Sequence, residues 1–139
     1  MPLFLNDEQS MLRDTAKDFV GESAPVSHMR KLRDDKDATG FSRDLWKQFA
    51  EMGFTGILIG EDQGGLGLGH VEAGVVLEEI GRNLSPSPFL STAVAAVEAL
   101  KGTGHAERWY PGILKGETVA ALAIDEGAKH RSSVGLKAE

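Results

Sequence analysis

The N-terminal part of the chain carries apolar residues at helical spacing. Asn6 is followed three places later by Gln9, the arrangement of a capping box. The pattern predicts an amphipathic helix that begins after Asn6, breaks between Gly21 and Pro25, and is followed by a shorter polar helix through Arg33. The apolar positions fall at i, i+4, i+7 and i+8, one face of this first helix: Leu12, Ala16, Phe19 and Val20.

Further helices are predicted along the chain. One starts after Ser42, a suitable N-cap, and ends at Gly53. The stretch 70–82 is apolar most of the way round, which is typical of a buried helix. The stretch 89–100 combines small apolar residues with a single charge, and 103–114 is a helix interrupted by proline. We expect the buried side chains to include Phe19, Trp46, Phe49, Val75, Leu77 and Ile80.

Short apolar runs separate or follow these helices. The run 54–59 is strand-like or extended, and 119–124 and 133–138 have the composition of short strands. The order predicts a mainly α protein. An orthogonal helical bundle over 1–117 is followed by the first strands of a β domain over 118–139.

Composition narrows the classes of partner. The chain has 139 residues, a formal net charge of −6, 41% hydrophobic residues and no cysteine. An acidic chain lacks the basic face that nucleic acid or a membrane surface needs. No segment approaches the ~20 apolar residues of a membrane span. Thiolate metal sites are excluded, and the four histidines are scattered, so no metal site is expected. These features predict a cytoplasmic protein with no nucleic-acid partner and no membrane span.

The segment GEDQGGLGLGH, at 60–70, is a candidate phosphate-binding loop because of its five glycines. A dinucleotide fingerprint needs glycines at i, i+2 and i+5, but the third place holds His70 or Glu72. A P-loop needs Lys and then Ser or Thr after its last glycine, and Leu66 or His70 stands there. Both nucleotide-binding templates fail.

The succession of short motifs is more informative than any one of them. In chain order they are Leu5-x-x-Glu8-Gln9-x-Met11-Leu12-Arg13-Asp14, Leu45-Trp46, Met52-Gly53-Phe54-x-Gly56, Glu61-x-x-Gly64-Gly65-Leu66-Gly67, Leu77-Glu78-Glu79-Ile80-Gly81, Arg108-Trp109-Tyr110-Pro111-x-Ile113-Leu114-x-Gly116-Glu117 and Ala120-Ala121-Leu122-Ala123. This succession resembles the N-terminal half of the acyl-CoA dehydrogenase family, from Leu5 to about Ala123.

The resemblance implies an N-terminal helical domain, a middle β domain and a C-terminal helical bundle, of which this chain holds the first and the start of the second. It implies FAD as cofactor, an acyl-CoA substrate oxidised to the 2,3-enoyl-CoA, a role in fatty acid or lipid metabolism, an electron-transfer acceptor protein and a homo- or hetero-oligomer. The family's carboxylate base lies in the C-terminal bundle, so no catalytic residue is assigned in this chain. The 139-residue chain alone is expected to be inactive.

The resemblance also implies where ligands lie. The helix 89–100 resembles the one that borders the acyl cavity, although ordinary helix packing explains its small residues equally well. The resemblance assigns the glycine loop an architectural role. Ligand contacts fall in two groups: the acyl cavity at Ser85, Phe89, Leu90 and Ala93, and the flavin at Ala123, Asp125 and Glu126.

The flavin segment departs from the family's pattern. Where the family has Thr-Glu-Pro-x-x-Gly-Ser-Asp, this chain has Asp125-Glu126-Gly127-Ala128-Lys129-His130. A carboxylate suits an electron-rich flavin edge less well than a hydroxyl, although Lys129 or His130 could compensate. The alternative is therefore a non-catalytic subunit or helical interaction module of the same fold that has lost flavin binding.

Overall fold

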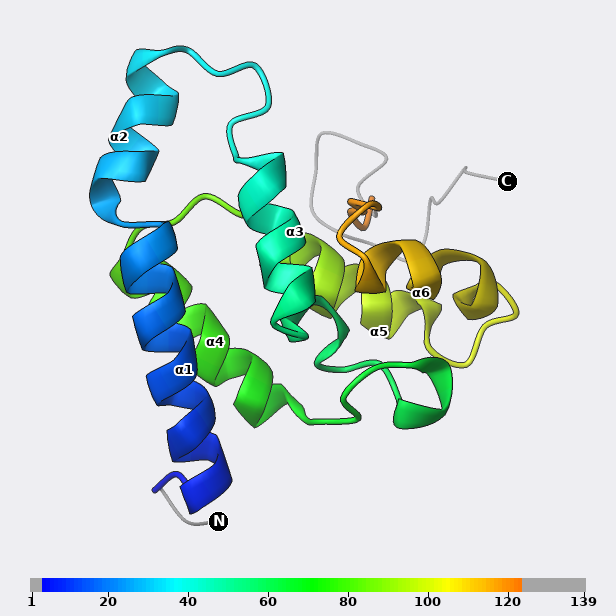
Figure 1. The fold of residues 1–139 in the computed structure, drawn as a ribbon. Coiled ribbons are helices and arrows are strands. Elements are labelled where there is room, and N and C mark those ends of the chain that lie inside the picture. Colours follow the sequence, from blue (N-terminus) through cyan, green and yellow to red (C-terminus); the bar gives the residue numbers. More distant parts are fainter. Residues whose placement is uncertain (1–3, 124–139) are drawn as a thin grey trace, which may run out of the picture.

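A computed structural model describes residues 4–123, and this part of the chain is mostly helical, as the sequence predicts (Figure 1). The elements are, in chain order, α1 (Asp7–Ser23), α2 (Val26–Asp34), α3 (Arg43–Glu51), the 3₁₀ turns η1 (Phe54–Gly56) and η2 (Glu61–Gln63), α4 (His70–Arg82), the π-helix η3 (Phe89–Ala96), α5 (Val97–Leu100) and α6 (Ala106–Leu114). None of the helices in this described range is long and apolar enough to cross a membrane.

Helices α1 and α4 run side by side in the same direction, and their N-termini meet (Figure 1). The predicted capping box is confirmed: the Gln9 backbone N–H donates to Asn6 Oδ1 at 2.7 Å, and the Asn6 N–H donates to Gln9 Oε1 at 3.0 Å. The amide of Gln9 also reaches across to α4, where its Nε2 donates to Glu72 Oε1 at 2.7 Å. One side chain therefore caps its own helix and joins it to its neighbour.

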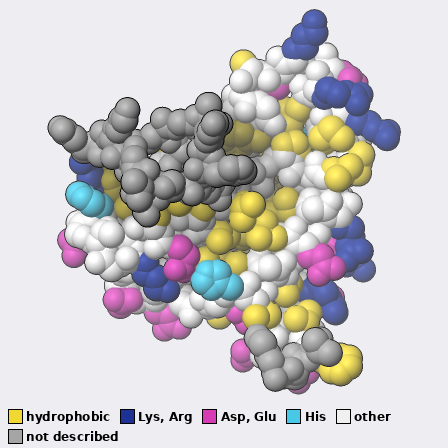
Figure 2. Space-filling view, turned by 180° about the vertical axis from the view of Figure 1, so that it is seen from behind, with side chains coloured by type: hydrophobic (Ala, Val, Ile, Leu, Met, Phe, Trp, Pro, Cys, Tyr) yellow, Lys and Arg dark blue, Asp and Glu magenta, His cyan; other side chains and the backbone are white. Residues whose placement is uncertain are grey.

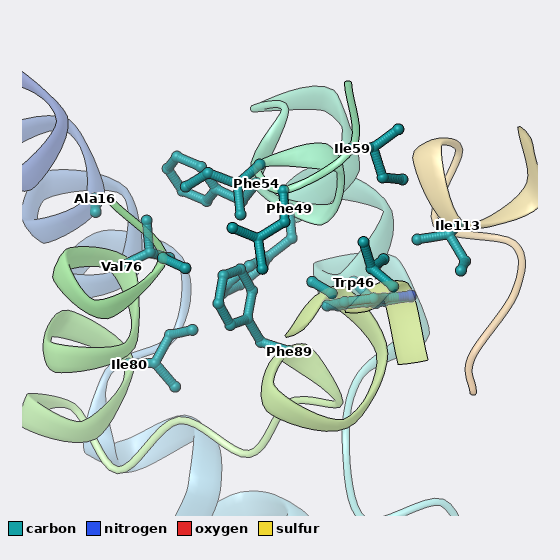
Figure 3. Packing of buried hydrophobic residues seen from close by; sticks show 14 of the residues in the cluster. Ala16, Trp46, Phe49, Phe54, Ile59, Val76, Ile80, Phe89 and Ile113 are labelled. Atoms are coloured by element: carbon teal, nitrogen blue, oxygen red, sulfur yellow. The ribbon is translucent and has the colours of Figure 1, made fainter. Parts of the chain in front are cut away.

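The core is built around the aromatic residues of α3. Phe49 is fully buried, and its ring lies 5.3 Å from Phe19, 5.9 Å from Phe54 and 6.3 Å from Phe89, centroid to centroid. Figure 3 shows Phe49, Phe54 and Phe89 between residues of α1 and α4 on one side and Trp46 and Ile113 on the other. Of the side chains predicted to be buried, Trp46, Phe49, Val75 and Ile80 are buried, whereas Phe19 and Leu77 are partly buried against the core.

The prediction of an extended segment at 54–59 is wrong. Gly53 takes a left-handed conformation with φ of 79° and ends α3, and the chain then winds into η1. Two hydrogen bonds close these turns, from Gly56 N to Gly53 O at 3.1 Å and from Ile59 N to Gly56 O at 3.1 Å. The apolar run is buried as expected, but it forms a pair of tight turns and not an extended segment.

The glycine loop folds back on these turns. The N–H groups of Leu66, Gly67 and Leu68 donate to the carbonyls of Gly56, Ile59 and Ile57, respectively, at 2.8 to 3.0 Å. A side chain at Gly65 would collide with the Ile59 backbone, so the close approach requires glycine there. Packing of backbone on backbone accounts for this glycine, which agrees with the architectural interpretation of the loop.

Two adjacent carboxylates of α4 lie in opposite environments. Glu78 is exposed, whereas the Glu79 side chain is 1% exposed. Arg82 binds both, with Nε 3.1 Å from Glu79 Oε2 and a terminal nitrogen 3.0 Å from Glu78 Oε1. Glu78 and Arg82 are four residues apart on one face of α4, and the buried Glu79 is a second partner of the same arginine.

Helix α6 closes the far end of the core and, in Figure 1, runs across the direction of α1. The buried Tyr110 hydroxyl donates to the Val97 carbonyl at 3.0 Å and ties α6 to α5. Burial, and secondly the Glu98 carboxylate, raise the pKa of Tyr110, so it stays a protonated donor at neutral pH. Gly116, with φ of 67°, then lets the chain turn closely past α3.

Candidate functional site

The candidate site begins at the connection between α4 and η3. Leu84 takes a left-handed conformation with φ of 49°, and its N–H donates to the Gly81 carbonyl at 3.0 Å. The Ser85 N–H donates to the Ile80 carbonyl at 3.0 Å, and its side chain is buried. Among residues 4–123, neither Ser85 Oγ nor Ser87 Oγ has a hydrogen-bond partner. Two buried hydroxyls are thus available just before η3.

The helix predicted at 89–100 is present, but its first eight residues wind as the π-helix η3 and only the last four as α5. A π-helix leaves wider turns than an α-helix and is frequent at functional sites. Sequence propensity does not distinguish the two windings, so the sequence predicts only a helix.

The residues assigned to the acyl cavity lie on two sides of η3. Phe89 and Ala93 are fully buried in the core, with Phe89 against Phe49. Leu90 is 59% exposed on the outer side. Helix η3 lies behind α3 in Figure 1, and in the opposite view hydrophobic side chains gather in the middle of the surface (Figure 2). Within the described residues, Ser85, Phe89 and Ala93 therefore face inward and Leu90 faces outward.

Thr92, between these residues, holds the segment that leaves the helical domain. This fully buried side chain accepts a hydrogen bond from Ala120 N and donates one to Ala120 O, both at 2.9 Å. A threonine in a helix usually bonds to a carbonyl of its own helix. Here the hydroxyl instead binds both polar groups of one distant residue, as a neighbouring strand would.

Residues 117–123 follow α6 without regular secondary structure. We call this segment the connector. The strand predicted at 119–124 is thus not present as a paired strand in its described part. The connector forms one wall of an apolar groove of about 330 Å³. Residues of η3, α5, α6 and the connector line it: Ala96, Ala99, Leu100, Trp109, Thr118, Val119, Ala120, Ala121 and Leu122.

The residues assigned to the flavin stand at the end of this connector. Ala123 is exposed. Asp125 and Glu126 lie outside the described residues, as does the strand expected at 133–138. In the range 4–123, no three His, Asp or Glu side chains gather where they could hold a metal ion.

The chain is similar to known proteins over most of its length. The sequence model of the family described as "Acyl-CoA dehydrogenase, N-terminal domain" matches residues 6–117. Acyl-CoA dehydrogenase IpdE2 of Mycobacterium tuberculosis is 30% identical over 121 residues, covering 86% of this chain and 37% of the relative. Mitochondrial isovaleryl-CoA dehydrogenase of Bos taurus is 30% identical over 138 residues, covering 96% of this chain and 32% of the relative.

Solved structures show the same fold. The ChsE4-ChsE5 complex from Mycobacterium tuberculosis contains a chain that superposes with a TM-score of 0.80 at 26% identity, covering 94% of this chain and 36% of that one. A variant of the Tcur3481-Tcur3483 steroid ACAD gives a TM-score of 0.76 at 29% identity, covering 88% of this chain and 34% of that one. This chain therefore spans about a third of the length of the proteins it matches.

Proposed function

Because the chain belongs to the acyl-CoA dehydrogenase family, through that family's N-terminal domain, we propose that it supplies the helical wall of a flavin-dependent acyl-CoA dehydrogenase. The proposed reaction oxidises an acyl-CoA thioester to the 2,3-enoyl-CoA. The observation that carries the proposal is the two-sided packing of η3: Phe89 and Ala93 anchor the helix in the core, and Leu90 stays exposed on its outer side. An apolar side chain on a rigidly held helix is suited to contact an acyl chain and to keep water from it.

The residues before Asp125 fit the flavin ring of FAD better than its pyrophosphate. Ala121 and Ala123 are exposed and carry only methyl groups, and the backbone of 121–123 has no hydrogen-bond partner within 4–123. Small side chains and free backbone groups suit the approach of a flat ring. The acceptor-only carboxylates of Asp125 and Glu126 would instead repel the pyrophosphate. We therefore propose that the ring edge of the flavin meets residues 121–123, ahead of the two carboxylates.

In this proposal the chain binds and orients the acyl chain and the flavin, and its residues transfer no proton. Bound FAD would accept the hydride from the acyl β-carbon. Leu90 would contact the acyl chain, the backbone at Ala123 would meet the ring, and the buried Ser85 hydroxyl would be a free hydrogen-bonding group beside η3. We propose that the base that takes the α-proton lies outside this chain, and that an electron-transfer protein reoxidises the cofactor.

The experiment is purification of the intact protein that contains this chain, followed by measurement of its flavin content and of enoyl-CoA formation with an artificial electron acceptor. The proposal predicts bound FAD and acyl-CoA-dependent turnover. The isolated 139-residue chain should show no turnover, because loss of a proton-transfer group alone typically costs ~10²–10⁴-fold in rate. Turnover by the isolated chain would contradict the placement of the base.

A second candidate is a subunit of a hetero-oligomer whose own flavin site is incomplete. The carboxylates at Asp125 and Glu126 favour it, as does the similarity to a chain of the ChsE4-ChsE5 complex. The two candidates differ in stoichiometry. A homo-oligomer with one FAD per chain supports the first, and a co-purifying unlike subunit with less than one FAD per chain supports the second.

A further inference from the structure

The connector 117–123 depends on few contacts for its position. Its first residues are held by the end of α6, where the N–H groups of Glu117 and Thr118 donate to the Gly112 carbonyl at 2.9 and 3.0 Å. Within residues 4–123, the backbone of 119–123 bonds only to Thr92. In the described part of the chain, the Thr92 hydroxyl is therefore the last polar contact before Ala123.

We propose that Thr92 is a positioning residue that sets the register of the connector and so places Ala123 for contact with the flavin. The inference rests on the proposed function, because it requires a flavin at this segment. It follows from the geometry of one side chain: Thr92 Oγ1 lies 2.9 Å from both Ala120 N and Ala120 O.

Register matters here because successive side chains of an extended chain point to opposite faces. A slip by one residue exchanges the two sets of side chains between the faces. Ala121, Leu122 and Ala123 are all exposed, and in an extended chain Ala121 and Ala123 would share one face and Leu122 the other. A slip would present Leu122, a much larger side chain, where Ala123 is expected to meet the ring.

The anchor point itself is rigid. Thr92 lies between Phe89 and Ala93 on η3, and all three residues are fully buried. Gly112 adds a second constraint, because a side chain there would collide with Thr118 Oγ1. The connector is thus guided along α6 and then fixed by η3, so a change at Thr92 is transmitted to Ala123 through three intervening peptide units.

The test compares variants of the intact protein that contains this chain. Thr92→Val keeps the shape of the side chain but loses both hydrogen bonds, whereas Thr92→Ser keeps the hydroxyl. Thr118→Val is the matched control, because the Thr118 hydroxyl lies on the same connector and has no hydrogen-bond partner within 4–123. The readouts are the FAD dissociation constant and the hydrogen-exchange rate of the Ala120 amide.

We expect Thr92→Val to raise both the FAD dissociation constant and the Ala120 exchange rate by roughly tenfold, the effect of losing about two ordinary hydrogen bonds. Thr92→Ser and Thr118→Val should stay within about threefold of wild type. A Thr92→Val protein that unfolds at a lower temperature but binds FAD with the wild-type constant would overturn the positioning role.

If Thr92→Val fails to fold, Ala120→Pro tests the same contact from the other side, because it deletes the N–H donor and leaves η3 unchanged. Wild-type FAD affinity in Ala120→Pro would also overturn the inference. A wild-type protein that takes up no FAD contradicts the proposed function, and with it the positioning role. Normal FAD uptake by wild type together with unchanged affinity in the variants contradicts the positioning role alone.

Discussion

Gln9 and Glu72, which are 63 residues apart in the chain, join the starts of two parallel helices through a hydrogen bond of 2.7 Å from Nε2 to Oε1. Glu72 Oε2 also accepts the Gly69 N–H at 2.9 Å, so this carboxylate serves the N-terminus of α4 as well. The positive ends of two helix dipoles and an acceptor carboxylate therefore lie together. The Gln9 side chain and backbone N–H groups hold the pKa of Glu72 below its ordinary value, against a smaller opposing effect of burial.

The lowered pKa of Glu72 predicts a stability that depends on pH. The group is more acidic in the folded state, so its contribution is present above the unfolded pKa and is lost as pH falls through the folded pKa. Glu72→Gln should reduce the free energy of unfolding at pH 7 and differ little from wild type in acid below both pKa values. Urea unfolding across this pH range checks the prediction, and a deficit that does not shrink with acid would contradict it.

Gln9→Ala should cost about 0.5–2 kcal/mol at neutral pH, the usual effect of losing a helix cap, because it removes half of the capping box together with the bond to α4. The matched control is Gln48→Ala on α3, whose side chain is exposed and makes no hydrogen bond within residues 4–123. Urea unfolding at pH 7 measures both variants. Equal losses in the two would show that the Gln9 bonds contribute nothing.

Local and non-local features differ in how far the sequence predicts them. Asn6 and Gln9 are three residues apart, so the capping box follows from the sequence. The bond to Glu72 does not, because it requires the packing of α1 on α4. The burial of Glu79 is partly predictable from the sequence. Glu79 stands three places after the buried Val76, on the same face of a helix that is apolar most of the way round.

The candidate site was predictable in outline only. The small residues of 89–100 and the family resemblance place a helix there, but which side of it faces the core is decided by partners such as Phe49. The contact of Thr92 with Ala120 spans 28 residues and has no local pattern. Apolar composition did not separate a strand from tight turns at 54–59, because both bury the same side chains.

The buried carboxylate of α4 should be more sensitive than its exposed neighbour. Arg82→Ala leaves Glu79 buried without its partner and should cost about 1–3 kcal/mol. Glu78→Ala removes only an exposed pair with the same arginine and should cost less than ~1 kcal/mol. Chemical denaturation of both variants gives the comparison. Similar small losses would show that water already satisfies Glu79.

Two glycines with similar backbone angles separate crowding from conformational strain. Gly116 has φ of 67°, and an added Cβ would lie 3.0 Å from Lys47 Cα and 3.1 Å from Trp46 O. Gly102 has φ of 74° with nothing within 4 Å of the same position. Both Ala variants carry the left-handed strain of ~1–2 kcal/mol, so Gly116→Ala should lose more stability than Gly102→Ala in thermal unfolding. Equal losses would mean that α3 and the turn after α6 can move apart.

The two sides of η3 predict different consequences for the same enlargement. Ala93→Phe overpacks the core and should cost about 1–3 kcal/mol of stability. Leu90→Phe changes an exposed side chain, so it should leave stability within about 0.5 kcal/mol. If Leu90 contacts the acyl chain, Leu90→Phe should shift the kcat/KM profile of the intact enzyme toward shorter acyl-CoA substrates. An unchanged profile would remove Leu90 from the acyl site.

We expect this helical domain to serve a flavin-dependent oxidation of an acyl-CoA. The most direct measurement is anaerobic titration of the intact purified protein with acyl-CoA substrates while the visible absorbance of the flavin is recorded. We expect the flavin band to bleach stoichiometrically and the matching 2,3-enoyl-CoA to appear. A folded protein that contains no flavin, or whose flavin stays oxidised with every acyl-CoA tried, would contradict it.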